Sequence, residues 1–205
     1  MAESALLRAR VYDPVLRLIH AGNALAVLVL LVSGQVVPGL GWSETATLGW
    51  SLHVHAGYAL MTGLIARLVW GWVGPGQARW TSLWHPGAWR GAFRHGRWFV
   101  APTAFGHHPV ASLAYLVIYA ALAVMVVSGL ALAAIDRNTG PLYDWLGNAV
   151  LWKGGFRMPH AWLQYLVLVF VLAHFSALVL HRRLHGIPVA QAMITGNQYL
   201  RRERE

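Results

Sequence analysis

The residues best suited to chemistry in this sequence are four histidines that stand inside or at the ends of apolar stretches: His20, His53, His160 and His174. His160 and His174 are fourteen residues apart. In an α-helix of about 3.6 residues per turn, this spacing puts both rings on one face with roughly 21 Å of rise between them. Histidine is a common axial ligand of haem iron. One helix could therefore supply a ligand to each of two stacked haems, and the rest of the chain must supply the two partners.

Four apolar segments would have to position these histidines. Of the 205 residues, 57% are hydrophobic and only 11% are charged, which is typical of a membrane protein. A bilayer core of about 30 Å needs about 20 mainly apolar residues per spanning helix. Four stretches qualify, at about 14–36, 48–73, 109–135 and 159–184. We predict an all-α fold, an integral membrane four-helix bundle that forms one domain over residues 1–205.

Local signals support the first of these segments. Asp13 followed by Pro14 predicts a helix start, with aspartate as the N-cap and proline in the first turn. No small-residue cleavage site follows the apolar run, so we interpret it as a retained helix and not as a signal peptide. The segment 109–135 carries none of the four histidines, and we expect it only to close the bundle.

The net charge of +9 is distributed unevenly between the two sides of the predicted bundle. Twelve basic residues lie on the side of the termini: Arg8, Arg10, Arg17, Arg79, Arg90, Arg94, Arg97, Arg182, Arg183, Arg201, Arg202 and Arg204. The other side has Arg137, Lys153 and Arg157. The positive-inside rule then predicts that both termini are cytoplasmic. The basic excess is a topology signal, and we expect no nucleic-acid partner.

The absence of cysteine excludes several redox centres. The chain can form no thiolate-bound iron–sulfur cluster and no Cys-x-x-Cys-His attachment of c-type haem. Acidic residues are few and lie outside the apolar segments, which disfavours a carboxylate-bridged metal site. A redox centre in this chain must therefore depend on histidine.

The depth of each histidine in the predicted bundle decides which can pair. His20 lies about two turns into the first helix from the cytoplasmic side, and His174 lies about two turns before the cytoplasmic end of the last helix. His160 begins the last helix on the outer side, where the second helix begins with His53 and His55. The depths predict one pair of His20 with His174, and one of His160 with a histidine of the second helix.

On the second helix, His53 and His55 are alternative ligands. His55 is rotated by about 200° from His53, so only one of them can face the pair. We assign His53, which shares a helical face with Arg67 fourteen residues later. A charged arginine in an apolar span usually faces the bundle interior or a partner, for which a haem propionate is suitable. The alternative for Arg67 is snorkelling to the headgroups.

Two pairs of histidines predict two non-covalent b-type haems. Two imidazoles fill both axial positions of an iron and leave none for oxygen or substrate, so such a haem carries electrons. A transition-metal transporter with intramembrane histidines is the rival function, although it would need further ligands along its path. A purely structural anchor subunit would not need histidines at paired depths.

The connecting segments carry aromatic and basic residues. The segment of about 74–108 is rich in tryptophan and arginine and suits the lipid headgroups. We interpret its histidines, His85, His95, His107 and His108, as surface residues. The segment 136–158 could form a short interfacial helix that docks an external redox partner, or it could anchor the chain at the headgroups.

Five parts of the sequence carry a resemblance to a known family. They are Val11-Tyr12-Asp13-Pro14 with Arg17 and His20; His53 with Gly57-Tyr58 and Arg67; Gly106-His107-His108-Pro109; the His160 and His174 spacing; and Met193-Ile194-Thr195-Gly196. In these, the chain resembles the bacterial cytochrome b561 family, which includes the b-type cytochrome subunits of nickel–iron hydrogenases. His55 and Ala21 depart from the pattern, since apolar and aromatic residues are usual there.

The resemblance implies a di-haem cytochrome b of the bacterial inner membrane, with His20, His53, His160 and His174 as ligands and with Arg17 and Arg67 binding the cofactors. Quinone and a redox protein, such as a c-type cytochrome or a dehydrogenase or hydrogenase subunit, are the implied partners. The chain would be an electron-transfer module, a quinone-linked oxidoreductase, or a haem-bearing membrane anchor of a hydrogenase-like enzyme.

Overall fold

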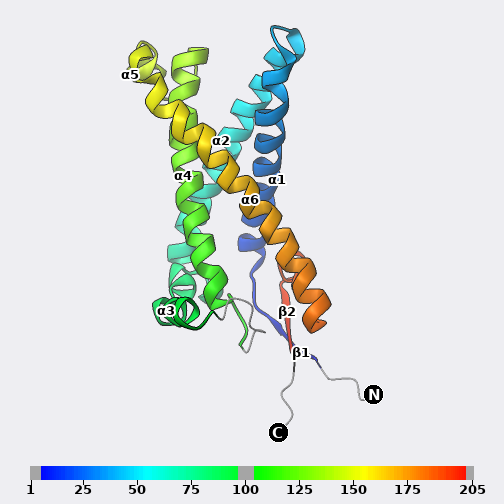
Figure 1. The fold of residues 1–205 in the computed structure, drawn as a ribbon. Coiled ribbons are helices and arrows are strands. Elements are labelled where there is room, and N and C mark those ends of the chain that lie inside the picture. Colours follow the sequence, from blue (N-terminus) through cyan, green and yellow to red (C-terminus); the bar gives the residue numbers. More distant parts are fainter. Residues whose placement is uncertain (1–5, 97–103, 202–205) are drawn as a thin grey trace. The chain divides into compact units, whose positions relative to one another are not determined.

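The computed structural model describes residues 6–96 and 104–201, and four of its helices are long and apolar enough to cross a membrane. They are α1 (Pro14–Val36), α2 (Glu44–Val73), α4 (Pro109–Arg137) and α6 (Lys153–His185), shown in Figure 1. Many of their large apolar side chains are exposed. Such continuous apolar surface is unusual for a water-soluble monomer. The predicted helical class and the four spanning-length helices are confirmed.

The helix α1 begins and ends where the sequence predicts. Its N-cap is Asp13, whose Oδ1 accepts a hydrogen bond from the backbone N–H of Leu16 at 3.0 Å. Pro14 is the first helical residue, where its missing N–H is no loss. A short 3₁₀ turn, η1 (Val37–Leu40), follows the helix.

The helices α2 and α6 begin earlier than predicted. Ser43 accepts a hydrogen bond from Ala46 N–H at 3.1 Å, which starts α2 four residues before position 48. The last helix begins at Lys153, so the predicted start at Pro159 is wrong by six residues. Pro159 lies inside the helix and has no N–H for the carbonyl of Gly155. An ion pair of 2.6 Å joins Lys153 to Asp136 near the end of α4.

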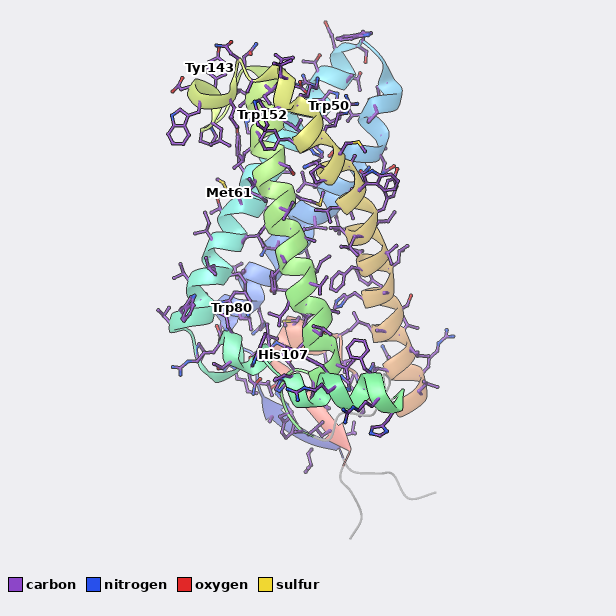
Figure 2. The ribbon with its side chains drawn as sticks, turned by 60° about the vertical axis from the view of Figure 1, so that its left-hand side comes forward. Trp50, Met61, Trp80, His107, Tyr143 and Trp152 are labelled. Atoms are coloured by element: carbon purple, nitrogen blue, oxygen red, sulfur yellow. The ribbon has the colours of Figure 1, made fainter. Side chains whose placement is uncertain are left out.

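Short elements connect the long helices. Between α2 and α4 lie η2 (Gly76–Ala78), η3 (Trp80–Leu83) and α3 (Pro86–His95). Between α4 and α6 lie α5 (Tyr143–Leu146) and η4 (Val150–Trp152), and α7 (Gln191–Thr195) follows α6. Figure 2 labels Tyr143 and Trp152 in the second connection, and both side chains are exposed there. This agrees with either interpretation of that segment.

Two short strands join the ends of the described chain. The strand β1 (Leu6–Arg10) pairs antiparallel with β2 (Asn197–Arg201), with Leu6 opposite Arg201 (Figure 1). Next to the sheet, the carbonyl of Gly196 accepts hydrogen bonds from the N–H groups of Val11 and Tyr12. Gly196 has a φ of +84°, which favours glycine. The all-α prediction needs this correction, because it contained no sheet.

The chain forms two compact units. The first unit comprises Met1–His20, Arg67–Val117 and Val171–Glu205, and the second comprises Ala21–Ala66 and Ile118–Phe170. The core of the first unit includes Tyr12, Leu16, Ala78 and Ala192. His20 and His174 belong to the first unit, and His53 and His160 belong to the second. Each unit therefore contains one of the two predicted histidine pairs.

Candidate functional site

The second unit brings together His53 of α2 and His160 of α6. Their ring centres are 6.3 Å apart, and the ring planes are inclined by 64°. Both side chains are half-buried. These residues are the pair that the depth argument predicted for the outer side.

The hydrogen bonds of His160 select one tautomer of its neutral ring. Its Nδ1 lies 3.1 Å from the carbonyl oxygen of Met125 and 3.0 Å from Oγ of Ser128, both on α4. A carbonyl oxygen can only accept, so Nδ1 must carry the proton. The other ring nitrogen, Nε2, then keeps its lone pair for a metal.

His53 has the same arrangement with a serine of α1. Its Nδ1 lies 2.8 Å from Oγ of Ser33. The hydroxyl hydrogen of Ser33 is directed to the carbonyl of Val29 one turn earlier, at 2.6 Å. The serine oxygen can then accept a hydrogen bond from the Nδ1–H group of His53. The lone pair of Nε2 is left available for a metal in this histidine as well. Each histidine of the pair is thus oriented by a helix that carries neither member of the pair.

A glycine follows each of these serines and lies against the same ring. A Cβ atom at Gly34 would be 3.5 Å from Cε1 of His53, and one at Gly129 would be 3.1 Å from Cε1 of His160. The absent side chains give the imidazoles room between the helices. Neither serine was among the predicted site residues, although the sequence contains a signal for them: Val-Ser-Gly occurs at 32–34 and again at 127–129.

The first unit brings together His20 of α1 and His174 of α6. Their ring centres are 6.5 Å apart with an inclination of 48°. His174 also lies against Phe175, 6.0 Å between ring centres. His20 is exposed, and within the described ranges its ring has no hydrogen-bond partner.

The separations of both pairs fit an iron between two imidazoles. A bond of about 2 Å from the metal to each nitrogen, plus roughly 1 Å from each nitrogen to its ring centre, gives about 6 Å between ring centres. Two ligands alone are too few for a bare transition-metal ion, which takes about four. In the described part of the chain, no three histidine, cysteine or acidic residues gather into a metal site. A haem, whose ring supplies four nitrogens, suits each pair.

His55 faces away from this arrangement. Its side chain is exposed, and Nδ1 donates to the backbone carbonyl of Ser51 in its own helix at 2.7 Å. Its ring contacts Tyr58 at 6.2 Å between centres. The two histidines at the start of α2 therefore differ in the way the sequence analysis expected.

Arg67 lies in the first unit and is only 3% exposed. Its guanidinium is 4.3 Å from the ring centre of Trp80, a cation–π distance. Trp80, labelled in Figure 2, donates from Nε1 to the carbonyl of Leu68 at 3.2 Å. The arginine therefore does not snorkel to an exposed position in this structure, and its pairing with a haem propionate stays a prediction.

His107 is packed inside the first unit, so its interpretation as a surface residue is wrong. Its ring lies 5.3 Å from that of Tyr12 and 6.3 Å from that of Tyr115, and its Nδ1 is 3.3 Å from Oγ of Ser82. It precedes the first residue of α4 by two positions and is labelled in Figure 2. Burial, the positive charge of Arg67 and the neighbouring His85, in that order of importance, together lower the pKa of His107 to about 4. Burial also raises the pKa of Tyr12.

Arg17 fastens the end of the chain to α1. Its Nε donates to the carbonyl of Met193 at 3.3 Å, and its Nη2 donates to the carbonyl of Ile194. Nearby, the side chain of Gln198 makes two hydrogen bonds to the backbone of Gly106, of 2.7 and 3.1 Å. We call these contacts, with the β1–β2 sheet, the terminal clasp. They give Arg17 a structural role, and its predicted cofactor contact stays a prediction.

Comparison with known proteins gives one family. The profile described as prokaryotic cytochrome b561 matches residues 11–196. A protein of Azotobacter chroococcum mcd 1, named "Probable Ni/Fe-hydrogenase B-type cytochrome subunit", is 31% identical over 196 residues, which cover 80% of this chain and 77% of that protein. No solved structure matches the chain.

More distant relatives carry similar names. A "Probable Ni/Fe-hydrogenase B-type cytochrome subunit" of Bradyrhizobium diazoefficiens is 25% identical, over 93% of this chain and 86% of its own length. A "Probable Ni/Fe-hydrogenase 1 B-type cytochrome subunit" of Escherichia coli K12 is 24% identical, over 91% of this chain and 88% of its own length. These matches extend over nearly the whole chain.

Proposed function

Because the chain belongs to the prokaryotic cytochrome b561 family, we propose that it transfers electrons across a membrane through two haems b, each bound between two histidines. Haem b and electron transport are properties of this family. The observation that carries the number of haems is the presence of two histidine pairs, with ring centres 6.3 and 6.5 Å apart. The pairs are His53 with His160 and His20 with His174.

In this function, the protein would bind the haems and orient their histidine ligands. When bound between two imidazoles, a haem would supply one-electron redox chemistry and would have no open position for substrate. His53 and His160 would present Nε2 to it, because their Nδ1 protons are donated to serine and carbonyl oxygens. The exposed apolar side chains of the long helices would exclude water from both sites when they face lipid.

The charge distribution supports an orientation. With twelve basic residues on the side of the termini and three on the other, both termini would be cytoplasmic in a bacterial inner membrane. The pair of His20 and His174 would then serve the cytoplasmic side. The pair of His53 and His160 would serve the outer side.

The names of the relatives support a partner. Each is called a B-type cytochrome subunit of a Ni/Fe-hydrogenase, and we propose a hydrogenase-like enzyme as the protein that exchanges electrons with this chain. A c-type cytochrome is the alternative partner. Quinone in the lipid phase would be the other electron carrier.

The measurement that tests this function is the haem content of the purified protein. We expect two haems b per chain in a pyridine haemochrome assay on protein expressed with ample haem, and two one-electron steps in a redox titration. One haem or none would contradict the proposal. Stoichiometric binding of Zn²⁺ by a haem-free protein would instead support the metal-transporter alternative.

We also propose that Arg67 contributes positive charge near the haem of the first unit, as the propionate hypothesis requires. Arg67→Leu would then lower the midpoint potential of that haem, because the guanidinium charge would no longer stabilise the reduced form. The shift would be on the order of tens of millivolts for an interaction of about 1 kcal/mol at an effective dielectric near 20. Arg79→Leu, at an exposed position, is the matched control. Unchanged potentials in Arg67→Leu would refute this role.

A further inference from the structure

Two helices carry the same three-residue segment at the same kind of contact. Val32-Ser33-Gly34 lies in α1 and Val127-Ser128-Gly129 lies in α4. In each, the serine oxygen meets Nδ1 of a histidine from another helix, and the glycine leaves room for that ring. Both histidines belong to the pair of the second unit. The repeated segment thus contacts both histidines of this pair, His53 from α1 and His160 from α4.

The serines are placed in a way that helix packing alone does not require. Ser33 is 6% exposed and Ser128 is 3% exposed, and a buried hydroxyl is costly unless it is hydrogen-bonded. Each hydroxyl hydrogen is directed to a carbonyl of its own helix, to Val29 at 2.6 Å and to Val124 at 2.7 Å. This bond alone would satisfy the donor. The oxygen is additionally turned to the imidazole, at 2.8 and 3.0 Å.

We propose that Ser33 and Ser128 are positioning residues that orient His53 and His160 and hold the haem between them at a lower midpoint potential than it would otherwise have. The inference rests on the proposed function. A group that accepts a hydrogen bond from Nδ1–H makes the imidazole a stronger electron donor to its metal. Stronger donation favours the ferric over the ferrous iron, so the potential falls.

The two serines differ in what would remain after their removal. His160 has a second acceptor, the carbonyl oxygen of Met125 at 3.1 Å. For His53, Ser33 is the only hydrogen-bond acceptor within the described residues. Ser33→Ala should therefore raise the midpoint potential of the second-unit haem more than Ser128→Ala does. The double variant should show the largest upward shift.

The test uses the full-length protein in detergent or nanodiscs. Haem content, a redox titration and the electron paramagnetic resonance signal of the ferric haems, which responds to ligand-ring orientation, are measured for each variant. The first-unit haem serves as an internal reference in every sample. Ser112→Ala is the matched control, since Ser112 is also buried in α4 and bonded to a backbone carbonyl, but its contacts are with Pro109 and Trp89. Ser33→Thr keeps the hydroxyl oxygen, so the second-unit haem should have the wild-type midpoint potential in this variant.

The outcomes separate the two proposals. An upward shift in the order Ser128→Ala, Ser33→Ala, double variant, with an altered resonance signal, supports the inference, as does loss of the second-unit haem that Ser33→Thr prevents. Unchanged potential and signal in both alanine variants overturn it while the proposed function stands. An equal shift in Ser112→Ala also overturns it. A wild-type protein without two haems refutes the proposed function, and the inference with it.

Discussion

The two histidine pairs are similar in separation and different in support. In the second unit, His53 and His160 are oriented by hydrogen bonds from α1 and α4. In the first unit, His20 is exposed and, among the residues described, its ring makes no hydrogen bond. The ring separations nevertheless agree to within 0.2 Å, from 6.3 and 6.5 Å.

This difference indicates two ways to prepare a ligand site. The pair of the second unit is pre-organised by side chains in direct contact with its rings. The surroundings of the first pair are fastened at a distance, by the terminal clasp and by the packed cluster of Tyr12, Arg67 and His107. We therefore expect substitutions near the second pair to change the electronic properties of its haem. Substitutions in the terminal clasp and at His107 should change the stability of the first unit instead.

The largest expected effect is the loss of one haem from two when a ligand is removed. His53→Ala should lose the second-unit haem and keep the other, and His20→Ala should do the reverse. His55→Ala is the control and should keep both, because its Nδ1 is bonded within its own helix. The haem content and redox titration of each variant check this. If His55→Ala lost a haem and His53→Ala did not, the assignment on α2 would be wrong.

The terminal clasp should matter for the first unit alone. Gln198 is 7% exposed, and Gln198→Leu would leave both the N–H and the C=O of Gly106 without these partners. Two such losses cost about 2–4 kcal/mol, or a fall in thermal midpoint on the order of 5–10 °C. Heating while the absorbance of each haem is recorded would measure it. Gln35→Leu removes an exposed hydrogen bond from the side-chain amide of Gln35 to that of Gln164, and this variant should have little effect on stability.

Acid should also weaken the first unit, through His107. Its pKa is about 4 in the folded protein against 6.5 ordinarily, so the unfolded chain binds the proton more readily. The stability contributed by the neutral ring is complete above about pH 6.5 and is lost as the pH falls toward 4, by at most about 3 kcal/mol. The groups that face the ring are Arg67, His85, Tyr12 and Tyr115.

The pH effect can be separated from that of other histidines. As the pH is lowered from 6.5 to 4, the thermal midpoint of the first unit, followed by the absorbance of its haem, should decrease in the wild type. The decrease should be smaller in His107→Gln. The exposed His95 provides a control, and His95→Gln should keep the wild-type profile. Identical profiles for all three proteins would show that His107 does not carry this dependence.

The smallest effect is expected from the two glycines. A Cβ at Gly129 would be 3.1 Å from the ring of His160, closer than ordinary contact, whereas one at Gly34 would be 3.5 Å from the ring of His53. Gly129→Ala should displace its ring slightly and cost about 1 kcal/mol. Gly34→Ala should be tolerated. The resonance signals of the second-unit haem should show this order, and a larger change for Gly34→Ala would contradict it.

The sequence predicted those features of the molecule that have a local pattern. The start of α1 at Asp13-Pro14 was readable because capping involves neighbouring residues, and the spacing of His160 and His174 follows from helical periodicity. The structure also brings together the histidine pairs that the alternating helix directions predicted.

Features that depend on distant contacts were not predicted. The apolar stretch predicts a helix start at about residue 159, but α6 begins at Lys153 and continues through Pro159 despite the lost hydrogen bond. The β1–β2 sheet joins residues almost 200 positions apart, and short strands of mixed polarity give no clear alternation. A serine in an apolar helix gives no sign of whether its oxygen meets a histidine, so only the repeated Val-Ser-Gly could have suggested Ser33 and Ser128.

One feature of the chain order bears on biosynthesis. Both pairs take a member from α6, the last of the long helices, and β2 follows it to close on β1. A ribosome delivers His20 and His53 long before their partners exist, and chains generally fold as their segments emerge. Neither proposed haem site would have its second histidine until the fourth long helix has been made. We therefore expect stable haem uptake to follow synthesis of α6, and nascent chains arrested before residue 160 should purify without tightly bound haem.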